Sequence, residues 1–276
     1  MTALSHTGTT NIRGARRRLA QVGLVARGAL YCLVGVLAVQ VAVGGGGGEQ
    51  ASQTGALRTI AQEPFGTVMV ALVGLGLLAY ATWRFSQFFT EKDAEDSDVK
   101  NAVMRTSYVV RSVIYVGLAY VAFRIAFGSG GGGGSSGQQS LTATLMRDLP
   151  AGVFIVGLLG VIVVGVGCYQ AYNAFGDDDF MDELRQHAMS PGVRRWTKRI
   201  GTAGHIARAI VYILIGVFIV VAAVQFDPQE ARGLDGALQT LARQPYGPWL
   251  LLAVAVGLVL YGVYTLIHAR YVKLDS

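Results

Sequence analysis

Six separate stretches of this chain are apolar over about 20 residues or more, and no other feature restricts its fold as strongly. An α-helix of that length crosses the roughly 30 Å hydrocarbon core of a bilayer. Strands of a membrane barrel would be shorter and would alternate apolar with polar residues, which these stretches do not. Charged residues make up 14% of the chain, compared with about 25% in soluble domains. The sequence therefore predicts an all-α integral membrane protein with transmembrane helices at residues 19–43, 66–89, 106–127, 152–175, 204–226 and 247–268.

A stretch between the first two apolar runs is written again later in the chain. Residues 54–66 (TGALRTIAQEPFG) and 235–247 (DGALQTLARQPYG) agree at seven of thirteen positions. A more divergent copy at 140–152 (SLTATLMRDLPAG) keeps the Pro-x-Gly ending that opens the second apolar run of each unit. The unit is thus helix, short loop and helix, and so long a period indicates a repeat architecture. We place the basic tail at residues 1–18, repeat one at 19–91, repeat two at 104–179 and repeat three at 200–275.

Each repeat contains two spans, so all three enter the membrane with the same orientation. Parallel repeats are related by an axis along the membrane normal. We therefore expect six transmembrane helices from three tandem two-helix repeats, arranged with pseudo-threefold symmetry about the membrane normal in one membrane domain.

The basic residues predict the orientation. Fourteen Lys and Arg lie in the N-terminal tail, the second and fourth loops and the C-terminal tail, whereas the other three loops hold four. The positive-inside rule then places both termini in the cytoplasm. The net charge of +6 reflects this distribution, and no basic motif interleaved with aromatic residues suggests nucleic acid binding.

The repeated loop motif predicts a short amphipathic helix in each outer loop. Leu57, Ile60 and Ala61 share a helix face, and Leu238, Leu241 and Ala242 share the corresponding one. Thr54 and Asp235 are suitable N-cap residues. We expect each loop helix to end at Pro-x-Gly and either to lie at the membrane interface or to cover the mouth of the bundle.

Arginine and tyrosine recur four residues apart in the first span of every repeat. All seventeen Asp and Glu lie outside the apolar runs, so no acid shares the span of these arginines. One interpretation is that the arginines are interfacial anchors that touch lipid phosphate. The other is that they converge near the axis as a ring that attracts an anion, with the tyrosines on the same helix face contacting the guanidinium groups. The pairs are Arg27 with Tyr31, Arg111 with Tyr115, and Arg208 with Tyr212.

Other polar residues in or near the spans have simpler interpretations. Arg84 and Arg124 have no repeat equivalents and are interpreted as interfacial anchors. The acidic runs at 91–98 and 177–183 are interpreted as solvated charge. Aromatic pairs in the second span of each repeat are interpreted as an aromatic belt with some packing. They are Tyr80 and Trp83, Tyr169 and Tyr172, and Tyr261 and Tyr264.

Arg-x-x-x-Tyr in the first helix and Pro-x-Gly before the second, three times in tandem, resemble a bacterial membrane family known as domain of unknown function 1206. The resemblance covers residues 19–275. It implies a three-copy, six-span protein of the bacterial cell (inner) membrane. It supplies no activity, substrate or catalytic residue.

The residue patterns favour no covalent chemistry. No spacing of Cys, His or acidic residues matches a metal site, no nucleophile motif is present, and we expect neither a cofactor nor an enzyme. Two functions remain open. One is passive permeation or transport of a small anion or neutral solute. The other is a non-transporting scaffold that binds lipids or partner helices. Anionic membrane lipids and a small anion are the expected partners, and the oligomeric state stays open.

Overall fold

The computed structural model describes residues 5–43, 51–90, 98–128, 139, 142–146, 152–175 and 179–273. Within these ranges the regular structure is helical, apart from one isolated β-bridge between Leu184 and Val272. Six helices are long and apolar enough to cross a membrane, which confirms the all-α, six-span fold class. They are α1 (Ser5–Ala42), α3 (Gly66–Thr90), α4 (Asp98–Ala126), α6 (Gly152–Phe175), α8 (Pro191–Gln225) and α10 (Gly247–Tyr271). Because α1 begins at Ser5, most of the predicted tail continues that helix.

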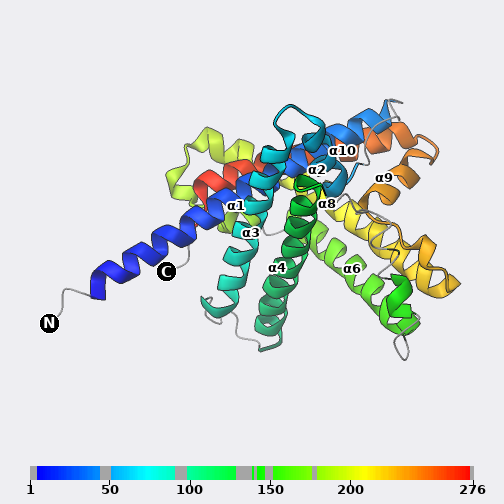
Figure 1. The fold of residues 1–276 in the computed structure, drawn as a ribbon, viewed down its shortest axis with the longest axis horizontal. Helices are drawn as coiled ribbons and strands as arrows, with labels where there is room; N and C mark the ends of the chain where they lie inside the picture. Colours follow the sequence, from blue (N-terminus) through cyan, green and yellow to red (C-terminus); the bar gives the residue numbers. More distant parts are fainter. Residues whose placement is uncertain are drawn as a thin grey trace.

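The long helices associate mainly between repeats. α1 packs along α10, α3 along α4, and α6 along α8, and the three pairs run in different directions from the middle of the molecule (Figure 1). Within repeats, α1 also packs on α3 and α8 on α10, whereas among the described residues α4 and α6 make no comparable contact. The helices therefore form a chain of contacts that is interrupted inside repeat two.

Small residues line the three pairings between repeats. In a lipid environment helices associate by close packing, and glycine, alanine or serine allows two backbones to approach. Equivalent positions of the repeats supply these residues in every pair, which explains why the pairs resemble one another. The close contacts are Gly28 with Gly262 and Gly35 with Ala255 between α1 and α10, Gly160 with Gly216 and Gly167 with Ala209 between α6 and α8, and the Ser112 hydroxyl with the Ala81 carbonyl between α4 and α3.

The repeated loop motif folds as predicted into short amphipathic helices, α2 (Gln53–Gln62) and α9 (Leu234–Ala242). Leu57 and Leu238 are fully buried against the long helices. The predicted N-caps are wrong, because both helices begin earlier. Ser52 caps α2 by accepting a hydrogen bond from the Gly55 backbone N–H at 3.0 Å, and Gly233 precedes α9. In repeat two, residues 142–146 are helical and most of the remaining motif lies outside the described residues.

The Pro-x-Gly ending has a steric cause. The middle residues, Phe65 and Tyr246, adopt left-handed backbone conformations with φ of 63° and 59°. A Cβ at Gly66 would collide with the Ile60 carbonyl oxygen at the end of the loop helix, and one at Gly247 with that of Ala242. Glycine is therefore required where the loop helix turns back into the following span.

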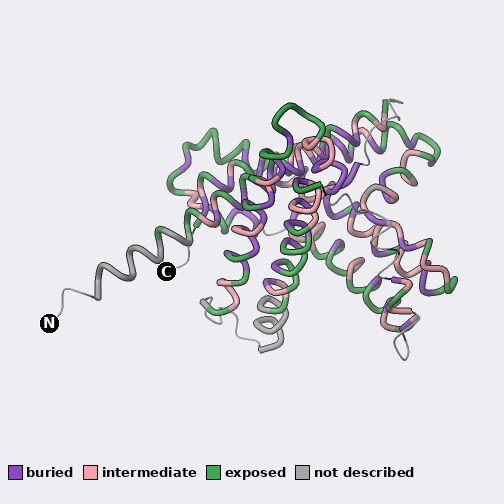
Figure 2. Tube along the Cα trace, in the orientation of Figure 1, coloured by how far each residue is buried: buried purple, intermediate pink, exposed green. Residues whose placement is uncertain are grey.

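The connection between α6 and α8 docks on the end of α10. It contains α7 (Asp179–Asp182) and the 3₁₀ helix η1 (Gln186–Ala188), while a second 3₁₀ helix, η2 (Pro228–Glu230), follows α8. The Arg185 N–H donates to the Tyr271 carbonyl at 2.8 Å, and the Lys273 N–H donates to the Glu183 carbonyl at 3.0 Å. These two backbone hydrogen bonds hold Glu183 beside α10. Figure 2 shows buried residues concentrated where α1, α3 and α10 meet, and long exposed stretches on α4 and α6.

Two glycines of α6 allow a direct test of the close packing. A Cβ at Gly160 would lie 2.8 Å from the Val220 backbone nitrogen, whereas one at Gly165 meets nothing within 4 Å. We expect Gly160→Ala to destabilise the protein by about 1–3 kcal/mol through overpacking. Gly165→Ala should be neutral or slightly stabilising, because alanine favours helix. Thermal unfolding in one detergent measures both, and equal stability of the two variants would contradict the packing described.

Candidate functional site

Two of the three motif arginines meet at one tyrosine hydroxyl in the protein interior. Arg27 and Arg208 are 7% and 9% exposed. The Arg27 guanidinium donates to the Tyr80 hydroxyl at 2.6 Å and also to Tyr261. The Arg208 guanidinium donates to the same Tyr261 hydroxyl, and its Nε and Nη2 donate to Tyr212 at 3.1 and 2.8 Å. A tyrosine oxygen has two lone pairs, so Tyr261 bridges repeats one and three.

Close helix crossings place each arginine on its tyrosine. In repeat one, a Cβ at Gly23 would lie 2.5 Å from Tyr80 Cα, and a Cβ at Gly76 would lie 2.6 Å from Ala26 Cβ. The backbones of α1 and α3 therefore nearly touch one turn before Arg27 and one turn before Tyr80. Repeat three has the same arrangement, with Gly204 against Tyr261 and Gly257 against Ala207.

Tyrosine rings surround the Arg27 guanidinium. Its central carbon lies 5.2 Å from the ring centre of Tyr80, 5.4 Å from Tyr261, 5.7 Å from Tyr115 and 5.8 Å from Tyr31. These rings come from α3, α10, α4 and α1, so four helices meet at this charge. An aromatic face attracts a nearby cation, and the attraction is strongest where water is excluded.

A third arginine, Arg84, belongs to the same cluster. It is 3% exposed, so its interpretation as an interfacial anchor is wrong. Its Nε donates to the Tyr80 hydroxyl at 2.9 Å, its Nη1 donates to Gln87 Oε1 at 2.9 Å, and its Nη2 lies 3.8 Å from Glu183 Oε2. Tyr80 thus connects Arg84 to Arg27 as Tyr261 connects Arg27 to Arg208. We call Arg27, Arg84, Arg208 and these two tyrosines the arginine cluster.

Glu183 supplies a negative charge at the edge of the cluster. Its carboxylate lies 3.8 Å from Arg84 and 3.7 Å from His268 Nε2, and its side chain is 48% exposed. Burial raises the pKa of this carboxyl group, but Arg84, and after it His268 and Arg111, lower it to about 2. Glu183 is thus half exposed, as a solvated run implies, but it is also paired with Arg84 and His268, which that interpretation did not include. The remaining acids of the two runs lie largely outside the described residues.

The third motif arginine is placed differently. Arg111 is exposed on α4, although Tyr115 beside it is buried. Counted from the Pro-x-Gly proline, repeat two has Val166 where the other repeats have Tyr80 and Tyr261, and Val166 is exposed. The sequence comparison that aligned Tyr169 with these tyrosines was out of register by three residues. Repeat two therefore lacks the partner that would draw its arginine into the interior.

The predicted aromatic belt also differs between repeat two and the other two repeats. Tyr80, Trp83, Tyr261 and Tyr264 are buried, so the interpretation as a belt is wrong for repeats one and three. The Tyr264 hydroxyl donates to the Phe180 carbonyl at 2.7 Å. In repeat two, by contrast, both aromatic residues are exposed, as a belt requires. They are Tyr169 and Tyr172. Arg124 lies 5.9 Å from the ring of Tyr120, and its role as an anchor stays a prediction.

The cluster has an excess of positive charge. The cluster contains three buried arginines. In the described part of the chain, the carboxylate of Glu183 is the one acidic group within 4 Å of any of them. Arg27 Nε is buried and has no hydrogen-bond partner there. Leaving a buried charge uncompensated is costly, so the arrangement suits an anion. For a metal, the described residues offer no group of three His, Cys, Asp or Glu.

The pairing of Glu183 with the cluster predicts a pH-dependent stability. We expect Glu183→Gln to destabilise the protein by about 1 kcal/mol at pH 7, since water screens a half-exposed pair. Because the folded pKa is lowered to about 2, the carboxylate's contribution is complete above pH ~5 and disappears as the pH falls toward 2. The melting temperatures of wild type and variant should therefore converge only below pH ~4. Asp182→Asn, at the neighbouring acid, is the control, and an equal effect of both changes would contradict the pairing.

Comparison with known proteins gives the chain a family. The model of Domain of Unknown Function (DUF1206) matches residues 22–90, 106–177 and 203–272. Uncharacterized protein YxxB of Bacillus subtilis (strain 168) is 32% identical over 255 residues, which cover 92% of this chain and 90% of the relative. No solved structure shows a significant match. Three matched segments and a relative of nearly full coverage agree with the repeats seen in the fold, and the chain therefore belongs to the DUF1206 family.

Proposed function

We propose that this membrane protein binds a small anion at the arginine cluster and that its activity is passive permeation or transport of that anion. The observation that carries the proposal is the excess of buried positive charge around Arg27, whose Nε has no partner among the described residues. In this proposal the chain performs no covalent chemistry.

The donors of the cluster suit an oxyanion or a halide. A guanidinium presents several N–H groups in one plane, and those of Arg27 and Arg208 that meet at Tyr261 have only a neutral oxygen as acceptor. An entering anion replaces this neutral acceptor with a charged one, so that the attraction between opposite charges adds to the hydrogen bonds. Arg84 is already paired with Glu183, so Arg27 and Arg208 are the groups with charge to offer.

Weak binding of the anion at the arginine cluster would favour its transport over its permanent binding. Conduction requires a site that attracts its ion but holds it weakly enough to let it leave. Tyrosine hydroxyls that already satisfy part of each guanidinium lower the gain from binding an anion, since the anion must compete with them. Glu183 contributes in the same direction, because its negative charge lies close to the cluster.

The alternative function is a scaffold that binds lipids or partner helices without transport. It is favoured by repeat two, where Arg111 and a series of large apolar side chains on α4 and α6 are exposed. In that case the arginine cluster serves only to hold repeats one and three together. The flux measurement below separates the two functions.

Anion flux into proteoliposomes tests the proposal. With chloride, phosphate and acetate as probes, we expect the wild type to conduct at least one, and Arg27→Gln with Arg208→Gln to lower its flux tenfold or more. Each lost charged hydrogen bond is worth about 1.5–3 kcal/mol, and 1.4 kcal/mol is a factor of ten. Lysine at both positions should restore part of the flux, because it keeps the charge and loses the fork.

Arg111→Gln is the matched control, since it removes the same residue of the same motif at an exposed position. It should leave most of the flux intact. Far-ultraviolet circular dichroism confirms that each variant is folded. Absence of flux for every probe in the wild type, with phospholipid bound at the arginines, would replace transport by the scaffold function.

We also propose that both termini lie in the cytoplasm of a bacterial cell, which the Lys and Arg distribution supports. Single cysteines introduced into a chain without Cys32 and Cys168 test this orientation. A membrane-impermeant maleimide added to whole cells should label Gly46→Cys and Gln229→Cys and should not label Glu95→Cys. Labelling of Glu95→Cys from outside would reverse the orientation.

A further inference from the structure

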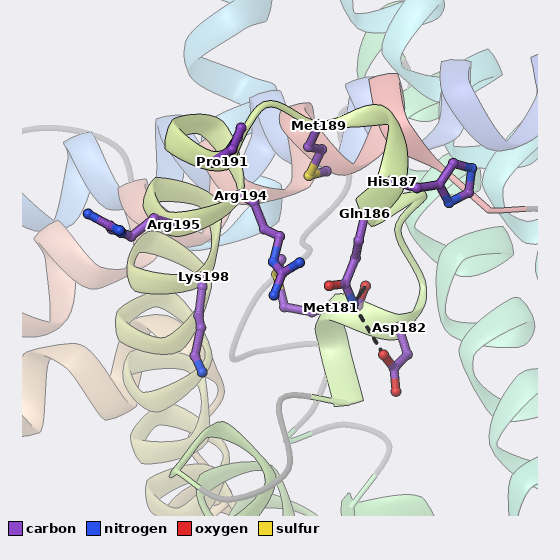
Figure 3. A pocket seen from close by; sticks show the side chains of 9 residues that line it. All are labelled: Met181, Asp182, Gln186, His187, Met189, Pro191, Arg194, Arg195 and Lys198. Carbon is purple, nitrogen blue, oxygen red and sulfur yellow. Dashed lines mark hydrogen bonds between the residues drawn. The ribbon is translucent and has the colours of Figure 1, made fainter.

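A cavity of about 690 Å³ lies apart from the arginine cluster, between the connection that follows α6 and the first turns of α8 (Figure 3). Met181, Asp182 and Gln186 line it on one side, and the α8 cations Arg194, Arg195 and Lys198 on the other. Gln186 Nε2 donates to the Met181 carbonyl at 3.1 Å and to Asp182 Oδ1 at 3.3 Å. These two bonds tie the Asp182 carboxylate and the Gln186 amide to each other.

The basic side chains differ in direction. In Figure 3, Arg194 extends across the cavity toward Gln186 and Asp182, and Lys198 stands one turn further along the same side of α8. Arg195 points to the other side of the helix, away from Gln186 and Asp182. Residues four apart share a helix face, whereas adjacent residues do not. The helix thus directs Arg194 and Lys198 toward Gln186 and Asp182, whereas Arg195 lines the cavity at its margin.

The wall opposite α8 is held in place. Met181 and Met189 are 4% and 8% exposed, and the chain between them is joined to α10 through the bridge of Leu184 with Val272. On the α8 side, the Ser190 hydroxyl accepts a hydrogen bond from the Val193 N–H at 3.4 Å and caps the helix. The cavity is therefore formed by two fixed elements.

Helix α8 has 35 residues, and at about 1.5 Å per residue it exceeds a roughly 30 Å hydrocarbon core by several turns. Its first residues include four cations, whereas the stretch that follows is apolar, so the excess lies at the N-terminal end. Trp196 in this part is 63% exposed, as expected at a membrane interface. We therefore expect Arg194 and Lys198 to lie at the level of lipid phosphates.

We propose that this cavity binds a phosphate group, held by the guanidinium of Arg194 and the ammonium of Lys198. Arginine binds phosphate with two parallel hydrogen bonds, and lysine adds a point charge. The partial positive charge at the start of α8 adds to the attraction. The phosphate belongs either to the headgroup of an anionic phospholipid or to a soluble phosphate compound. The site is separate from the arginine cluster, so this inference stands independently of the proposed anion transport.

Binding of two probes to the full chain tests the site. One probe is phosphatidylglycerol, measured as lipid retained in native mass spectra from nanodiscs that contain phosphatidylcholine and phosphatidylglycerol. The other is inorganic phosphate, titrated against the detergent-solubilised protein by calorimetry. Arg194→Gln and Lys198→Gln should each weaken binding about tenfold or more. Arg199→Gln removes the same kind of charge from the same helix at an exposed residue outside the cavity lining, and should change binding less than about threefold.

The two probes distinguish the source of the phosphate. Retained phosphatidylglycerol that inorganic phosphate does not displace indicates a lipid headgroup, and binding of inorganic phosphate alone indicates a soluble compound. Binding of neither probe overturns the inference. So does an equal loss in Arg199→Gln and Arg194→Gln, which would mean general attraction to a basic surface. Matching melting temperatures of the three variants establish that they are equally folded.

Discussion

A guanidinium group keeps its charge at any pH a cell experiences, so an arginine inside a membrane bundle must be surrounded by groups that accept its hydrogen bonds. In this chain the groups are tyrosine hydroxyls. Tyr261 accepts from Arg27 and Arg208, and Tyr80 accepts from Arg27 and Arg84. These bonds require the backbones to nearly touch at Gly23 and Gly204, and the close crossings in turn define how repeats one and three are built.

Repeat two shows the consequence of losing the tyrosine acceptor and the close helix crossing. Val166 replaces the tyrosine, and Ser107 and Val110 replace the glycine and the alanine that precede the arginine in the other repeats. Arg111 is exposed, and the described residues of α4 and α6 do not make the close contact found within the other two repeats. The pairings between repeats keep their small residues throughout, so the divergence affects only the interior of one repeat. The bundle combines two repeats that enclose charge with one that leaves it exposed.

Much of the fold could be predicted because it depends on local patterns. The apolar runs give the spans, and Pro-x-Gly gives the end of each loop helix, since both depend on residues close in the sequence. Counting from the prolines aligns Tyr80 with Tyr261 and places Val166 at the equivalent position of repeat two. Tyr80 and Tyr261 were missed as hydrogen-bond acceptors because tyrosines near the end of a span are also typical of an interfacial belt.

The pairing of Glu183 with Arg84 could not be predicted from the residues next to Glu183 in the sequence. It lies in a run of acids, and its contact with Arg84 depends on a bridge between Leu184 and Val272, which are far apart in the chain. The burial of Arg84 was missed in part for the same reason, because its acidic partner Glu183 comes from another segment.

We propose that the arginine cluster needs an anion to balance its charge. Anomalous diffraction from crystals grown in bromide, and separately in selenate, can locate such an anion. We expect an anomalous peak within hydrogen-bond distance of the Arg27 guanidinium, between Tyr80 and Tyr261, in at least one of the two. Crystals that show no peak at the cluster with either anion, although peaks appear elsewhere on the protein, would contradict it.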